Sequence, residues 1–274
     1  TLFASILLVN LLVSFFAGFS LNRGLMYVGR DIAVAAHRGD TVNTPENSLS
    51  AIESALQMGA NVVEFDVQMT SDGVVVLHHD LTLARMAGIS ERVSDLSYLE
   101  IMGLTIGTGY DEAYREEGIP TLLSALQLIQ NRGEALIDVK VYGSAEELAQ
   151  EIVLTVEAVN MVEDVYVQSF DYELLQEIRR LNPEIRIGQI MYYALGSLSR
   201  LDVDFYTIQK GMLNRDLMQR ARRLGRDVWV WTLYEEEEIK EVLQFDIQGI
   251  ITGNVPLVLE IIGLETSTEF DEES

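Results

Sequence analysis

Residues 32–67 read IAVAAHRGDTVNTPENSLSAIESALQMGANVVEFDV and place a helical pattern between two apolar, β-branched runs. The runs Ile32–Ala36 and Val62–Val67 have the length and composition of buried strands, and the apolar residues 49, 52 and 56 have helical spacing. Two strands joined by a helix pair in parallel, because parallel neighbours need a long crossover connection. This stretch therefore predicts the start of an α/β fold with a parallel sheet.

The same alternation continues along the chain. Further strands are predicted at Val74–His78, Ala135–Val139, Val165–Ser169, Ile185–Ile190, Phe205–Ile208, Val228–Leu233 and Gly249–Thr252. About eight strand–helix units in roughly 230 residues favour a closed (β/α)8 TIM barrel over an open, doubly wound sheet. No G-x-G-x-x-G motif follows the first strand, which counts against a dinucleotide-binding sheet. We expect the barrel to span residues 29–264.

The N-terminal segment is apolar. Residues Thr1–Ser20 carry no charge, and about 20 such residues are needed to cross a bilayer as a helix. We therefore predict a transmembrane anchor and linker over residues 1–28, with a cleaved signal peptide or a buried core helix as alternatives. Arg23 and Arg30 alone do not fix the orientation.

Two other segments depart from the alternating pattern. The stretch Thr82–Thr121 contains five glycines and no clear period, so we expect an insertion near the mouth of the barrel. The acidic tail Glu265–Ser274 has no apolar period, and we expect it to be disordered.

Composition excludes several classes of function. The 274 residues include 19 Lys and Arg, 43 Asp and Glu and no Cys, giving a net charge of −24 at pH 7. The lack of Cys excludes a disulfide scaffold, a thiolate zinc site and a thiol nucleophile. A chain this acidic has few cationic side chains that could displace the counterions of nucleic-acid phosphates. A nucleic-acid partner is therefore not expected. The hydrophobic content of 48% is enough for a sizeable core.

Acidic side chains lie at predicted strand ends. Glu64 and Asp66 are two residues apart on one strand, so they point to the same face. Asp138 ends another strand and could join them. Converging carboxylates repel one another unless a cation lies between them. Oxygen-only ligands suit one hard divalent cation, Mg²⁺ or Ca²⁺.

Basic residues lie at the same ends. The three histidines of the chain, His37, His78 and His79, all stand at predicted strand ends, where they could supply acid/base catalysis. His78 and His79 should face opposite ways, so only one of them can point into the site. Arg38 and Lys140 are suited to holding a phosphoryl oxygen. Asn43 or Thr44 could cap a helix that begins at Pro45.

With these residues in view, the stretch from His37 to Asp80 resembles the glycerophosphodiester phosphodiesterase family. The family pattern is H-R-G, P-E-N, G-A, E-x-D-V, T-x-D-G and H-D. It is matched here at residues 37–39, 45–47, 59–60, 64–67, 70–73 and 79–80. Weaker similarities follow at residues 119–122, 138–140, 168–170 and 231–232. The resemblance extends from about Ala33 to Gly263.

The resemblance implies both an activity and a set of roles. The activity is hydrolysis of glycerophosphodiesters, the deacylated headgroups of phospholipids, to sn-glycerol 3-phosphate and an alcohol. His37 and His79 would form the acid/base pair. Arg38 and Lys140 would hold the phosphate of the small-molecule substrate. The metal ligands would be Glu64, Asp66 and Asp138, with Glu46 close to the same ion. In the family a substrate hydroxyl is thought to attack first, giving a cyclic phosphate. The resemblance to membrane-anchored bacterial members also implies a barrel outside the cytoplasm.

Three residues depart from the family pattern. Asp138 replaces the usual Glu and is one methylene shorter. Tyr234 replaces the Asn of W-T-x-N, and Gly253 replaces the Asp of T-D-x-P. The last two changes suggest an altered alcohol specificity. Two alternative functions stay open: a lysophospholipase-D-like enzyme acting on lipids, and a catalytically weak pseudoenzyme that binds headgroups.

Overall fold

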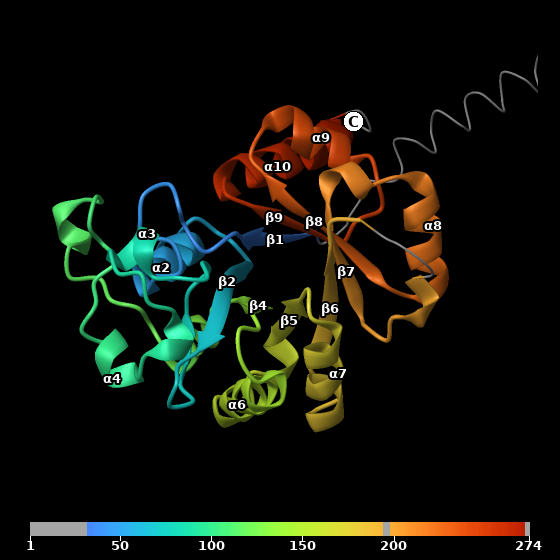
Figure 1. Ribbon diagram of the computed structural model, residues 1–274. Helices are drawn as coiled ribbons and strands as arrows, with labels where there is room; N and C mark the ends of the chain where they lie inside the picture. Colours follow the sequence, from blue (N-terminus) through green and yellow to red (C-terminus); the bar gives the residue numbers. More distant parts are fainter. Residues whose placement is uncertain (1–31, 194–197, 272–274) are drawn as a thin grey trace, which may run out of the picture.

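The computed structural model describes residues 32–193 and 198–271, along which strands and helices alternate (Figure 1). The strands of these ranges are β1 (Ala33–Ala36), β2 (Val62–Met69), β3 (Val75–Leu77), β4 (Glu134–Val139), β5 (Val165–Ser169), β6 (Arg186–Met191), β7 (Phe205–Gln209), β8 (Asp227–Leu233) and β9 (Gly249–Thr252). The helices are α2 (Leu49–Gln57), α3 (Ala84–Ala87), α4 (Tyr98–Ile101), α5 (Leu122–Ile129), α6 (Ala145–Ala158), α7 (Tyr172–Leu181), α8 (Arg215–Leu224), α9 (Glu236–Leu243) and α10 (Val255–Asp271).

The sheet is a closed barrel. Its order is β1-β9-β8-β7-β6-β5-β4-β2, and β1 also pairs with β2, so these parallel strands form a ring. The prediction of a (β/α)8 TIM barrel is confirmed. Closure removes every free edge from the ring and brings all eight carboxyl ends to one face.

β3 lies outside this ring. It pairs antiparallel with β2, with Val67 opposite Leu77. The run predicted at Val74–His78 is therefore the return strand of a hairpin. The reason is the short connection: residues 70–74 form a tight turn in which Gly73 has a φ of +86°. So short a link can join antiparallel strands only.

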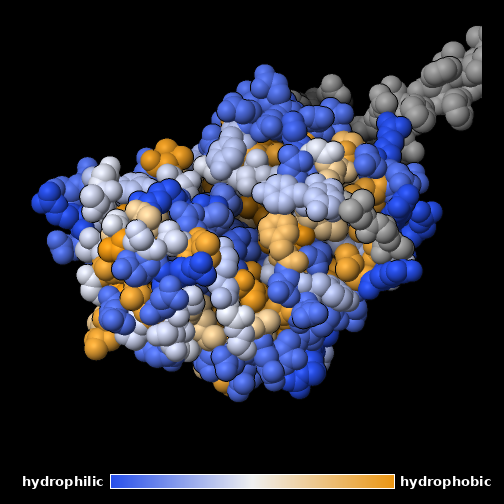
Figure 2. Space-filling view, viewed as in Figure 1, coloured by the Kyte–Doolittle hydropathy of each residue, from blue (hydrophilic) through white to orange (hydrophobic). Residues whose placement is uncertain are grey.

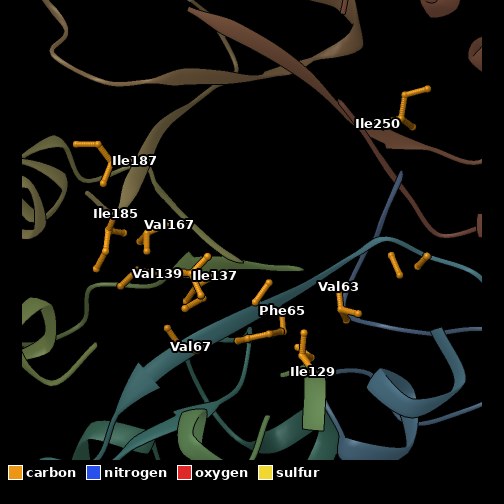
Figure 3. Close-up of a cluster of buried hydrophobic side chains, with 14 of the residues drawn as sticks. Val63, Phe65, Val67, Ile129, Ile137, Val139, Val167, Ile185, Ile187 and Ile250 are labelled. Atoms are coloured by element: carbon orange, nitrogen blue, oxygen red, sulfur yellow. The ribbon is translucent and has the colours of Figure 1, made fainter. Parts of the chain in front are cut away.

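The strands separate two layers of side chains. On β2, Val63, Phe65 and Val67 point outward into the apolar layer beneath the helices (Figure 3). Alternate residues of the same strand therefore point into the barrel. A second cluster fills the interior of the barrel: Ala33, Ala35, Val62, Leu136, Tyr166, Phe205, Trp229 and Ile251. This packing fills the barrel interior below the carboxyl ends of the strands.

The insertion forms a small unit of its own beside the barrel. Residues 82–121 contain α3 and α4, which lie at one side of the ring (Figure 1). A separate apolar cluster holds this unit together: Val76, Leu83, Met86, Val93, Ile101, Ile106 and Ile119. The insertion thus has a core, although its sequence has no clear period.

Two details differ from the sequence-based expectations. Helix α2 begins at Leu49, capped by the Ser48 hydroxyl, which accepts from the Ala51 amide. Residues 45–47 therefore belong to the preceding loop and not to a helix capped by Asn43 or Thr44.

Helix α10 continues to Asp271, into the tail expected to be disordered. Once a helix has started, adding residues to it costs little free energy.

The predicted anchor at residues 1–28 lies outside the described residues. Within residues 32–193 and 198–271, none of the helices combines the length and the apolar character that crossing a bilayer requires. Hydrophilic residues cover most of the face seen in Figure 2, in keeping with the net charge of −24.

Candidate active site

The carboxyl ends of the barrel strands surround a cavity of about 170 Å³. One wall carries charged and titratable side chains: His37, Arg38, Glu64, Asp66, His79, Asp138 and Lys140. The other wall is mainly apolar and comes from β5, β6, β8, β9 and their loops: Gln168, Phe170, Ile190, Tyr192, Trp231, Thr232 and Ile251. The structure therefore brings every predicted site residue except Glu46 to the lining of one cavity.

Three buried carboxylates form the centre of the polar wall. Glu64, Asp66 and Asp138 each offer an oxygen, and these atoms lie within 4.8 Å of one another. The exposed fractions of the three residues are 1%, 1% and 7%. Asp66 on β2 is directly opposite Asp138 on β4 in the parallel register. The predicted convergence of these three acids is confirmed.

The neighbouring cations compensate the three carboxyl groups unequally, so the pKa values of these groups shift in different directions. Burial raises the pKa of Glu64 well above its usual range, and repulsion from Asp66 and Asp138 adds to the effect. Burial also raises the pKa of Asp138 to about 6, although Lys140 opposes the shift. For Asp66 the charges of Lys140 and Arg38 outweigh burial, so its pKa lies below the usual range. Without a further cation, two of the three carboxyl groups hold protons more tightly than in water.

The donor set fits a divalent cation. Asp138 Oδ1 is buried and accepts no hydrogen bond within the described part of the chain. A buried acceptor without a donor, beside two other carboxylates, is satisfied by a bound cation. Because all three side chains offer oxygen, the group suits Mg²⁺ or Ca²⁺.

Lys140 and Arg38 flank the carboxylates. Lys140 Nζ lies 3.0 Å from Asp66 Oδ1 and 2.8 Å from Asp138 Oδ2. Arg38 Nε lies 3.2 Å from Asp66 Oδ2, outside hydrogen-bond geometry. Both cations line the cavity, where they can meet a phosphate and the carboxylates together.

The backbone of the H-R-G turn sets the position of Arg38. Its φ is +58°, an unfavourable value for a residue with a side chain. The Arg38 amide donates to Glu64 Oε2 at 2.8 Å, and its carbonyl accepts from the Asn47 amide at 3.1 Å. Gly39 packs directly on α2, since a Cβ there would lie 2.6 Å from the backbone of Ala51. Position 39 therefore requires glycine, and the turn that it permits places Arg38 at the lining of the cavity.

The histidines divide as expected. His37 and His79 line the cavity, whereas His78 is buried and its Nε2 lies 3.0 Å from the Thr82 carbonyl. Burial, with the charge of Arg38, lowers the pKa of His37 to about 4, so its ring is neutral at neutral pH. His79 Nδ1 lies 2.8 Å from Asp80 Oδ1, which leaves Nε2 for the cavity.

Glu46 is held by arginines. Its carboxylate accepts from Arg38 Nη1 at 3.0 Å and from both terminal nitrogens of Arg85 at 2.7 and 2.8 Å. Despite partial burial, Arg85 and Arg38 lower the pKa of Glu46. Glu46 is not a member of the carboxylate group found among the described residues. Its contacts favour a role in positioning Arg38.

Sequence reasoning missed three contributors to this site. Arg85, from the insertion, also donates to Asp80 at 2.7 Å and so links His79 to Glu46. The Asn47 side chain makes two hydrogen bonds of 2.9 Å with Asp66: its Nδ2 donates to Asp66 Oδ2, and its Oδ1 accepts from the Asp66 backbone amide. The P-E-N motif signalled Asn47, but Arg85 has no sequence signal, because only the fold brings the insertion to the cavity.

The third missed contributor is the aromatic part of the apolar wall. The Phe170 and Tyr192 rings stack with centroids 5.5 Å apart and an interplanar angle of 8°. Tyr192 also meets Trp231 edge-on at 4.8 Å. Phe170 and Tyr192 are 50% and 58% exposed, so this wall opens to solvent beside the polar one. Two of these rings had a sequence signal: Phe170 ends the Q-S-F motif, and Trp231 begins the W-T motif.

This combination defines a class of enzyme. A closed barrel whose cavity joins a buried all-oxygen ligand group, two cations and two histidines is built for phosphoryl chemistry. Comparison with known proteins specifies the class further. The profile of the glycerophosphoryl diester phosphodiesterase family matches residues 37–257. The chain belongs to this family and is a phosphoric diester hydrolase that converts glycerophosphodiesters to glycerol 3-phosphate.

Relatives agree with this assignment. The chain is 28% identical over 241 residues to a glycerophosphodiester phosphodiesterase of Caldanaerobacter subterraneus subsp. tengcongensis, covering 84% of this chain and 97% of that protein. Its fold is similar to that of a glycerophosphodiester phosphodiesterase from Agrobacterium tumefaciens, with a TM-score of 0.73, 24% identity and coverage of 84% and 99%. A phosphodiesterase from Oleispira antarctica, solved with the product sn-glycerol-3-phosphate, has a TM-score of 0.75, 24% identity and coverage of 87% and 98%.

Cation affinity should depend on pH through this carboxylate group. Metal ligands must be deprotonated, and without an ion Asp138 has a pKa of about 6 and Glu64 a raised pKa. We expect the dissociation constant for Ca²⁺ or Mg²⁺ to fall as the pH rises through about 6, with protons released on binding. Calorimetry in two buffers of different ionisation enthalpy measures both effects, with Asp138→Asn as the control that should weaken the dependence. A dissociation constant that does not change across this pH range would contradict the prediction.

Proposed function

We propose that His37 and His79 are the acid/base pair of this hydrolase, and that Glu64, Asp66 and Asp138 bind one divalent cation, Mg²⁺ or Ca²⁺. The observation that carries the proposal is the single cavity they share with Arg38 and Lys140. A relative from Oleispira antarctica binds the product sn-glycerol-3-phosphate, which supports a glycerol phosphate as the ligand of this chain.

The two histidines have different surroundings and therefore different roles. His37 is neutral at neutral pH, because burial lowers its pKa to about 4, so it can accept a proton from the attacking oxygen. His79 is oriented by Asp80, itself fixed by Arg85, so it can give a proton to the departing alcohol oxygen. Such a pair avoids forming either a free hydroxide or a free alkoxide.

Charge on the phosphoryl oxygens is met from the polar wall. Arg38 and Lys140 line the cavity on either side of Asp66 and would bind these oxygens as charge develops. A bound divalent cation would supply additional Lewis-acid stabilisation of the same oxygens. Glu46 and Arg85 hold Arg38 in place and do not reach the substrate in this proposal.

The test is release of sn-glycerol 3-phosphate from glycerophosphocholine, glycerophosphoethanolamine and glycerophosphoglycerol. We expect release with Mg²⁺ or Ca²⁺ and none with a chelator. His37→Ala and His79→Ala should each lower kcat by about 10² to 10⁴, the usual effect of losing a general acid or base. His78→Gln is the matched control and should keep wild-type rates, because its ring faces away from the cavity. Wild-type rates in the His37 and His79 variants would refute the assigned roles.

A lysolipid is the second candidate substrate. The observation that favours it is the exposed apolar wall, in which Phe170 and Tyr192 lie beside the polar side chains. An acyl chain would bury apolar surface against these rings. Running lysophosphatidylcholine beside glycerophosphocholine in the same assay separates a lipid substrate from a deacylated one.

The two late departures from the family pattern fit each other. The Tyr234 ring lies against Gly253, where a Cβ would be only 2.2 Å from Tyr234 Cε1. Burial and the nearby charges of Arg38, Glu64 and Glu46 act on the Tyr234 hydroxyl, with a net rise in its pKa. We propose that this pair replaces the Asn and Asp of the family pattern and sets the alcohol preference.

The coupling of this pair can be measured. Gly253→Ala should displace the Tyr234 ring. We expect this to change KM, or the ratio of kcat/KM between two headgroups, by about tenfold. In a Tyr234→Asn background the same alanine should have little further effect, because the clash is gone. Gly103→Ala controls for an added methyl group, because a Cβ there would lie 3.8 Å from the Glu100 carbonyl oxygen, an ordinary contact distance. Equal effects of Gly253→Ala in both backgrounds would contradict the coupling.

We also propose that residues 1–20 anchor the enzyme to a membrane with the barrel outside the cytoplasm. The support is the uncharged, apolar sequence of this segment. The full chain should stay with membranes after carbonate washing, and a chain lacking residues 1–28 should be released. Protease added to intact spheroplasts should digest the barrel. A full chain extracted by carbonate, or a barrel protected from protease, would contradict the respective part of this proposal.

A further inference from the structure

A buried glutamine faces the same cavity as the carboxylate group. Gln168 is 3% exposed and stands on β5, where it lines the cavity together with Asp138. Its side-chain oxygen, Oε1, is buried and accepts no hydrogen bond within residues 32–193 and 198–271. Leaving a buried amide oxygen unpaired is unfavourable, so this acceptor calls for a donor or a cation.

The register places Gln168 next to the carboxylates. Asp66, Asp138 and Gln168 stand at one level on the adjacent strands β2, β4 and β5. On the other side, Gln168 is opposite Gly188 of β6, which has no side chain to donate to it. Asp138 Oδ1 is likewise without a partner. Two neighbouring acceptors, both buried and both unpaired, line one cavity.

We infer that Gln168 supplies a fourth protein oxygen to the divalent cation, through its side-chain amide carbonyl. This inference rests on the proposed metal site. Asn and Gln carbonyls are regular ligands of hard cations, of Ca²⁺ above all. Asp138 is one methylene shorter than the glutamate of the family pattern, so its carboxylate extends less far from β4. A neutral oxygen from the next strand gives the ion a further ligand on that side.

Neighbouring polar groups do not account for the unpaired oxygen. The Lys140 ammonium already contacts Asp66 and Asp138. Trp231 lines the same cavity, but its buried indole N–H makes no hydrogen bond to Gln168. A water molecule bridging Gln168 and Asp138 is the competing explanation, and it predicts that removing the Gln168 oxygen leaves cation affinity unchanged.

The experiment is calorimetric titration of the full chain with Ca²⁺ and with Mg²⁺, in the absence of substrate. Gln168→Met keeps the length of the side chain but removes the oxygen, and we expect it to weaken binding about tenfold or more. Gln168→Glu keeps an oxygen and should bind at least as tightly as the wild type. Thr207→Val is the matched control: this buried threonine also has an unpaired oxygen but does not line the cavity, so affinity should not change.

Each outcome separates this inference from the proposed function. If the wild type binds neither ion, the metal site itself fails. If the wild type binds and Gln168→Met binds equally well, the metal site stands and the role of Gln168 is refuted. Thermal melting in chelator verifies that each variant is folded. Should Gln168→Met not fold, Gln168→Asn withdraws the amide oxygen by one methylene, and unchanged affinity in that variant would equally overturn the inference.

Discussion

The structure depends on holding three carboxylates together inside an apolar barrel. Glu64, Asp66 and Asp138 offer oxygens within 4.8 Å of one another and are nearly inaccessible to solvent. Burying like charges so close together is unfavourable unless cations compensate them. Lys140 and Arg38 do so mainly for Asp66, which leaves the pKa values of the other two raised. The carboxylate group therefore lacks compensating positive charge, which is consistent with a divalent metal site at this position.

One strand serves both the core and the site. On β2 the odd-numbered positions 63, 65 and 67 pack beneath the helices, and the even-numbered Glu64 and Asp66 point into the barrel. A slip of one residue would exchange the two sets. The apolar outer layer therefore fixes the inward direction of the acids. Closure of the ring through β1 and β2 then brings the loop with His37 and Arg38 to the same cavity.

A chain of ion pairs extends the site into the insertion. His79, Asp80, Arg85, Glu46 and Arg38 are linked in that order by contacts of 2.7 to 3.0 Å. Arg85 belongs to α3, whose segment packs around its own apolar cluster. The insertion thus fixes both the histidine and the arginine of the site from outside the barrel. The Glu46 and Arg38 side chains are the best shielded of the five, at 13% and 17% exposed, so their mutual attraction is stronger than that of an exposed pair.

The sequence by itself determined the barrel, because alternating strand and helix periods leave few other topologies. It also determined the inward pair Glu64 and Asp66, through the two-residue period of a strand, while the resemblance to the family favoured His79 over His78. Only the tertiary structure decided that β3 turns back as a hairpin, that Glu46 pairs with Arg85, and that Gln168 stands beside Asp138. It also decided that Tyr234 fills the space left by Gly253. Local periodicity fixes which way a side chain points, but contacts between distant segments depend on strand register and loop paths, which no local pattern encodes.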